Sequence, residues 1–151
     1  MTNRTSVEVF LSFIGKEPNY DFSLSTVTDK LRVTPTSTSK KGEQIGTSSL
    51  PERQYSNTIW MYSTGRIETY DFEMVTQMIV RTFKDKVRTI KELIRELEIE
   101  PWFCAITSVE DGISPGYSLS LEVMDFAISI GAEFEIDQYV SGFVEDDLEE
   151  V

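Results

Sequence analysis

Carboxylates are the only abundant side chains in this sequence whose types and spacing could support chemistry. Glu133, Glu135 and Asp137 alternate along one short segment, so their side chains are expected on one strand face, with neighbours about 7 Å apart. That separation would suit a glycosidase pair or a hard cation such as Mg²⁺. The same pattern also describes an acidic strand that faces solvent, and no adjoining motif marks a cleft.

Other catalytic motifs are missing from the sequence, which has no histidine and one cysteine, Cys104. Ser/His and Cys/His triads, His-containing zinc sites and CxxC sites are therefore excluded. The segment 40–43 lacks the glycines and the Ser or Thr of a phosphate-binding loop. Cys104 lies in an apolar stretch and is expected to be a buried, inert thiol. The sequence predicts no cofactor.

Charge is distributed very unevenly along the chain. The formal net charge is −12, all 14 basic residues lie at or before Arg95, and 15 of the 26 acidic residues follow it. A surface of this sign repels phosphate, which argues against nucleic acid as a direct partner. The acidic half could recognise a basic protein, or it could neutralise the cations between Arg81 and Arg95 within the chain. Those cations could also belong to an ordinary solvated helix surface.

Hydrophobic periodicity predicts a mixed α+β fold with the order β-α-β-α-(α)-β-α-β. A continuous apolar stripe at helical spacing covers 72–97, with a break expected at Lys84-Asp85. A second helix, ending at Gly131, is expected to be buried on most sides. The other predicted elements are strands 7–13, 59–62, 102–109 and 134–139, a short helix from Ser23 or Ser25 to Leu31, and a polar loop 36–56.

We therefore predict a single α+β domain over 1–144, with about four strands covered by helices, most simply on one face. Strand 102–109 is apolar on both faces and should be central. Trp60, Trp102 and Phe126 are expected in the core. The acidic tail 145–151 is predicted to be disordered.

The sequence also favours a cytoplasmic location without membrane contact. No apolar run approaches the ~20 residues that span a bilayer, and the first residues contain no apolar core of a signal peptide. A single cysteine cannot form an internal disulfide and suits a reducing compartment.

Several short motifs follow one another over residues 7–140. They are Phe13-Ile14-Gly15, Leu31 to Thr36, Lys41-Gly42-Glu43, Trp60, Leu119-Ser120, Phe126 to Gly131, and Ile136 to Tyr139. In this order and spacing, the chain resembles the bacterial family of small proteins known as domain of unknown function 4279. The family pattern Leu-Gly-hydrophobic-x-Pro would place glycine where this chain has Arg32. The resemblance implies a fold but transfers no catalytic residue.

A binding role therefore agrees best with the sequence. We expect a non-catalytic inhibitor of the immunity or antitoxin type, whose acidic surface neutralises a basic toxin, for example a nuclease. The predicted contact residues are Glu110, Asp111, Glu133, Glu135, Asp137 and Tyr139. The alternative is a carboxylate-based enzyme, with or without Mg²⁺, or a metabolite-binding domain. Scaffold, regulatory and dimerisation roles also stay open, and Asp137 and Tyr139 could be purely structural.

Overall fold

The computed structural model describes residues 4–46 and 53–141, which form one mixed α+β domain. The predicted tail 145–151 lies outside the described residues. The strands are β1 (Ser6–Gly15), β2 (Ser37–Ser39), β3 (Ile59–Ser63), β4 (Ile67–Glu68), β5 (Ile99–Val109) and β6 (Phe134–Val140). The helices are α1 (Leu24–Leu31), α2 (Phe72–Phe83), the 3₁₀ turn η1 (Lys84–Lys86), α3 (Val87–Leu97) and α4 (Leu121–Ile130).

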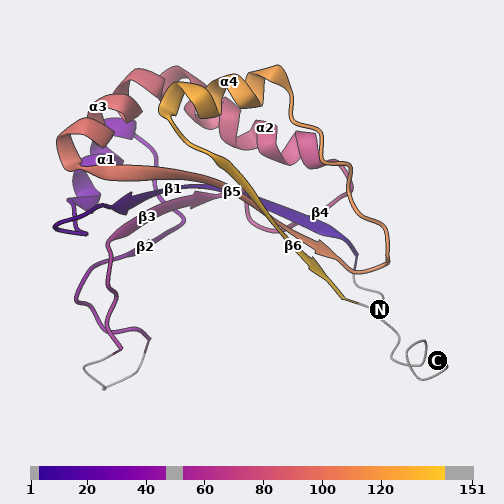
Figure 1. Ribbon diagram of the computed structural model, residues 1–151, viewed down its shortest axis with the longest axis horizontal. Helices are drawn as coiled ribbons and strands as arrows, with labels where there is room; N and C mark the ends of the chain where they lie inside the picture. Colours follow the sequence, from indigo (N-terminus) through magenta and orange to yellow (C-terminus); the bar gives the residue numbers. More distant parts are fainter. Residues whose placement is uncertain (1–3, 47–52, 142–151) are drawn as a thin grey trace.

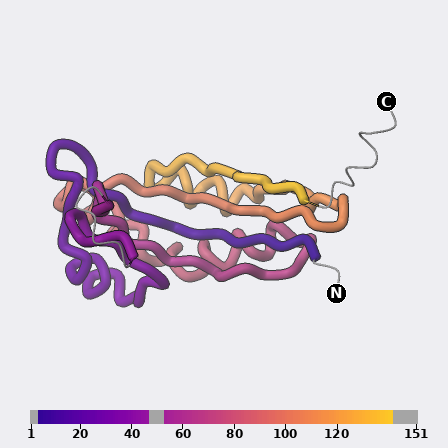
Figure 2. Tube along the Cα trace, turned by 90° about the horizontal axis from the view of Figure 1, so that it is seen from below, coloured from indigo at the N-terminus to yellow at the C-terminus, as the bar shows by residue number. Residues whose placement is uncertain are grey.

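The six strands form one sheet in the order β2-β3-β1-β5-β6, with β4 pairing with β1 beside this path. β1 and β5 are antiparallel over ten residue pairs, from Ser6↔Ser108 to Gly15↔Ile99. β6 runs parallel to β5 and lies along one margin of the sheet (Figure 2). Strand β5 is therefore an inner strand, as its two-sided apolar pattern predicts.

Period-two alternation divides the sheet into two unlike faces. On β1, Val7, Val9, Leu11 and Phe13 are all fully buried, as are Phe103 and Ala105 on β5. These side chains pack against the helices, which all lie on one side of the sheet (Figure 1). Among the described residues, the other side carries no helix, and we call it the open face. The expected one-sided helical layer is thus confirmed.

The helices begin and end where the sequence predicts. The side chains of Ser23, Asp71 and Ser120 cap α1, α2 and α4 by accepting backbone N–H bonds, which satisfies donors that a helix start leaves free. The expected break in the 72–97 stripe is confirmed, because η1 separates α2 from α3. In the described part of the chain, no helix is long and apolar enough to cross a membrane.

Arg32 ends α1 in a left-handed conformation, with φ 56° and ψ 38°. Its backbone N–H donates to Thr28 O at 2.8 Å. A side chain with a Cβ is disfavoured in this region by roughly 1–2 kcal/mol. This geometry explains why a glycine would suit the position and shows that arginine is nevertheless accommodated there.

Three expectations about the fold need correction. The sheet has six strands instead of about four, because β2 and β4 contain three and two residues and lack a readable period. Helix α4 buries only one face, and Leu121 and Ile128 are 81% and 78% exposed, because α4 lies on the outside of the helical layer. Trp102 is 45% exposed, since it projects from β5 onto the open face.

The two tryptophans should therefore differ in their contribution to stability. Trp60 is fully buried, its ring lies 5.6 Å from Phe13, and its indole donates to Thr28 Oγ1 at 3.0 Å. We expect Trp60→Ala to lower the free energy of unfolding by ~3–5 kcal/mol and Trp102→Ala by about 1 kcal/mol or less. Urea denaturation measures both. Equal losses would contradict the placement of Trp102 on the open face.

Candidate binding surface

Acidic and aromatic side chains gather on the open face along β5 and β6. The parallel register pairs Cys104 with Glu135, Ile106 with Asp137, and Ser108 with Tyr139. Phe134 points the other way, and its ring lies 4.6 Å from that of Phe103 beneath the helices. The alternation predicted for the last strand is therefore confirmed. It places Glu135, Asp137 and Tyr139 on the uncovered side, where all three are exposed.

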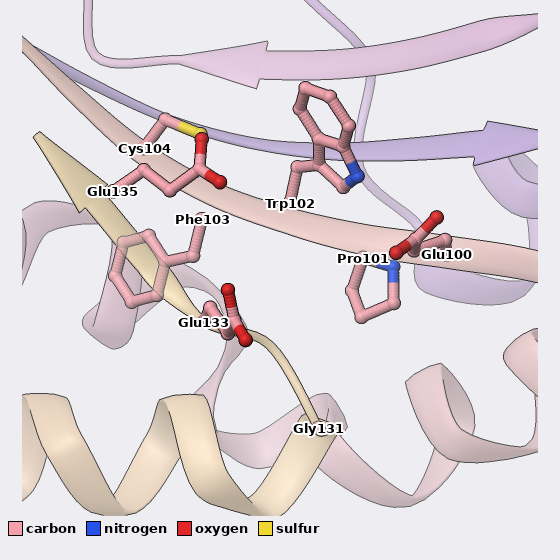
Figure 3. Close-up of a pocket in the computed structure, with 8 residues that line it drawn as sticks. All are labelled: Glu100, Pro101, Trp102, Phe103, Cys104, Gly131, Glu133 and Glu135. Atoms are coloured by element: carbon pink, nitrogen blue, oxygen red, sulfur yellow. The ribbon is translucent and has the colours of Figure 1, made fainter. Parts of the chain in front are cut away.

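A pocket of about 240 Å³ lies where β5 and β6 begin. Figure 3 shows Trp102 rising from β5 on the side opposite α4, while Phe103 points toward α4. The lining residues are Glu100, Pro101, Trp102, Phe103, Cys104, Gly131, Glu133 and Glu135. Three carboxylates and one exposed indole thus surround a space that could hold a single cationic side chain.

The surroundings of the Cys104 thiol at this pocket disfavour its thiolate form. It is 5% exposed, and its Sγ lies 3.9 Å from Glu135 Oε2 (Figure 3). Burial, followed by the negative charges of Glu135 and Asp137, raises the pKa of Cys104 to about 11. A thiolate is the nucleophilic form of cysteine, so this site disfavours covalent chemistry at Cys104. The expectation of a buried thiol is confirmed.

Glu110 and Asp111 occupy a different place from the other predicted contact residues. Both lie just beyond the C-terminal end of β5, and both contact other residues of the chain. Glu110 accepts a hydrogen bond from Ser141 Oγ and lies 3.9 Å from Arg66 Nη2. Asp111 accepts hydrogen bonds from Tyr70 OH, Ile113 N and Thr5 Oγ1, which lower its pKa. These two carboxylates therefore have intramolecular partners already.

Two other predicted contact residues differ in this respect: Glu133, just before β6, and Asp137 within it. Across residues 4–46 and 53–141, Glu133 and Asp137 accept no hydrogen bond and form no ion pair. The structure thus places Glu135, Asp137 and Tyr139 on β6, with Glu133 just before the strand, and separates all four from Glu110 and Asp111. Glu100 and Trp102 join this group from β5. In the sequence, the alternation of Glu100, Trp102 and Cys104 along β5 indicates that these three side chains share one face of the strand.

The cations of the helices and the carboxylates of β6 lie on opposite sides of the sheet. α2, η1 and α3 carry the cations between Arg81 and Arg95 within the helical layer (Figure 1). Among the described residues, no ion pair joins these cations to a carboxylate beyond Pro101, and Arg88 pairs with Glu92 within α3 at 3.6 Å. Arg66–Glu110 is the one described ion pair that links the basic and acidic parts. The acidic residues of β6 thus form no ion pair with the basic helix among the described residues.

Metal binding was the alternative chemistry for the alternating carboxylates. In the part of the chain that the structure describes, no group of three or more His, Cys, Asp or Glu side chains is arranged to hold a metal ion.

The fold and this surface define a mixed α+β domain with one uncovered, acidic sheet face. Residues 4–141 match the family described as Domain of unknown function (DUF4279), and the chain belongs to this family. The match covers the motifs that suggested the resemblance. Comparison with curated proteins gives no match, and comparison with solved structures gives none either.

Because its pKa is raised, the Cys104 thiol should react slowly in the native protein. With a pKa near 11 instead of the ordinary 9.0, the thiolate fraction at pH 8 falls by about 100-fold. We expect the native protein to react with a disulfide reagent at least that much more slowly than the urea-unfolded chain. Glu135→Gln should accelerate the native reaction, because it removes one cause of the shift, whereas Glu122→Gln on α4 should not. Equal native and unfolded rates would contradict this description of the site.

Proposed function

We propose that this chain is a non-catalytic binding protein of the immunity or antitoxin type, which neutralises a basic protein partner in the cytoplasm. The open face is the proposed contact surface. The observation that carries the proposal is the row of exposed carboxylates formed by Glu133, just before β6, and by Glu135 and Asp137 on it; Glu133 and Asp137 have no hydrogen-bond or ion-pair partner among the described residues. Clustered like charges destabilise a fold slightly, so their position favours a role outside the chain.

The pocket between Trp102 and Glu133 suits one side chain of a protein partner. Its volume of about 240 Å³ lies below the roughly 300–1,000 Å³ of usual ligand pockets. A lysine or arginine side chain is small enough to enter it. There the cation would lie beside the Trp102 ring, which favours cation–π contact, and near Glu133 and Glu135, which favour charge-assisted hydrogen bonds.

The separation of charge across the sheet supports a basic partner as well. The open face is acidic, while α2 and α3 on the opposite side carry cations. The acidic open face would attract a basic protein, and the cations of α2 and α3 would oppose its approach to those two helices. Nucleases are one class of basic toxin, because their substrate is a polyanion.

The proposed function can be tested genetically. The protein encoded next to this gene is expressed alone and together with this chain, with cell growth as the measurement. We expect the neighbouring protein to arrest growth alone and the wild-type chain to restore it. Co-expression of Glu133→Gln/Glu135→Gln should restore growth less well. A neighbour that is harmless, or a toxic neighbour that the chain does not neutralise, would contradict the proposal.

Association kinetics with that neighbour should identify the charged surface. We expect Glu133→Gln/Glu135→Gln to slow association several-fold without lowering the melting temperature, because the two carboxylates attract the partner but do not stabilise the fold. Raising the ionic strength through 0.1 M, where the Debye length is about 10 Å, should slow the wild type.

The matched control is Glu122→Gln/Asp125→Asn on α4, which removes the same net charge from the other side of the sheet. It should leave the association rate close to wild type. If both double variants slow association equally, the effect comes from net charge, and the open face is not the contact surface.

A further inference from the structure

Strand β6 forms one margin of the sheet, and its outer edge is unpaired among the described residues. It is the last strand in the order β2-β3-β1-β5-β6, and within residues 4–46 and 53–141 only β5 pairs with it. Figure 2 shows it along the margin of the sheet. At seven residues it is much longer than β2, the three-residue strand at the opposite margin. Unpaired edge strands are templates for the addition of another strand.

The register shows which backbone groups of β6 point outward. Ser141 N donates to Val109 O at 2.9 Å, so position 141 directs its N–H toward β5. Because these directions alternate along a strand, positions 135, 137 and 139 also face β5. The N–H and C=O groups of Ile136 and Gln138 then point away from the sheet, toward the free edge. They form the hydrogen-bonding pattern that an added strand requires.

The position of β6 is fixed by its side chains. Gln138 Nε2 donates to Ser114 Oγ at 3.0 Å and to Tyr117 OH at 2.6 Å. Phe134 packs against Phe72 and Phe103 under the helices. An added strand would therefore meet an ordered edge and would lose less entropy in binding than it would against a mobile one.

The charge of β6 selects the kind of strand that can be added. Glu135 and Asp137 lie on the open face directly beside the edge, with Glu133 just before the strand begins. Like charges opposite one another on neighbouring strands are destabilising, and opposite charges are stabilising. A second copy of β6 is therefore repelled, whereas a strand with alternating lysine or arginine side chains is attracted.

We propose that the basic partner docks by strand addition, with an extended basic segment that pairs with the outer edge of β6. This inference rests on the proposed function and specifies its contact. Alternate basic side chains of the added strand lie on the open face beside Glu135 and Asp137, and the intervening side chains lie on the helical side near Ile136. Backbone hydrogen bonds supply affinity, and the acidic row supplies specificity.

The test uses the full chain and a fluorescent eight-residue peptide of alternating lysine and valine as the probe. Ile136→Pro removes one outward N–H without touching the β5 ladder, since proline is tolerated on edge strands when its nitrogen faces solvent. Ile136→Ala is the matched control, because it also shortens the side chain but keeps the N–H. We expect the wild type and Ile136→Ala to bind the peptide similarly, and Ile136→Pro to bind at least tenfold more weakly.

A second measurement keeps the test valid if Ile136→Pro folds poorly. The same peptide methylated on alternate backbone nitrogens keeps every charge but loses one row of donors. Two such peptides, methylated in the two alternate phases, are compared on the wild-type chain. We expect one phase to lose at least tenfold in affinity and the other to bind nearly as well as the unmodified peptide.

Equal binding of all three peptides, or equal binding to Ile136→Pro and Ile136→Ala, would overturn strand addition. Failure of the unmodified peptide to bind at low salt would overturn it too. Neither result touches the proposed function, which stands or falls on neutralisation of the neighbouring protein and its dependence on Glu133 and Glu135.

Discussion

The antiparallel pairing of β1 with β5 is the constraint on which the rest of the structure depends. Ten consecutive residue pairs fix the register, and a shift of one residue would turn every side chain to the opposite face. In the observed register, Val9 and Leu11 of β1 and Phe103 of β5 lie under the helices and are fully buried. The apolar core and the open face are two consequences of this single pairing.

One-sided coverage by helices explains the chemistry of the open face. Trp102 and Cys104 lie on the same strand, yet Trp102 is 45% exposed and Cys104 only 5%, because neighbouring strands shelter the smaller side chain. β6 extends this face with carboxylates that the core does not require. Local features that the fold does not need are expected at functional sites, and this is the physical basis for assigning recognition to β6.

The sequence predicted those helices and strands whose hydrophobic spacing is visible within their own residues. The 72–97 stripe, its break near Lys84, and the alternation of β6 all required only local spacing. The strand pairs of β2 and β4 depend on partners distant in sequence, so two or three residues could not reveal them. An apolar segment such as β5 also does not show which of its faces is covered. Trp102 was therefore placed in the core, and Glu100 was not included in the candidate site.

The central claim is that the open face, and not the helical layer, contacts a basic partner. The two tryptophans test it directly, because Trp60 is buried under the helices and Trp102 lies at the acidic pocket. Their indole N–H signals can be followed by NMR while the proposed basic partner is added to the protein. The account predicts that the Trp102 signal shifts while that of Trp60 stays in place. An unchanged Trp102 signal, together with shifts of backbone amides in α3 or α4, would contradict it.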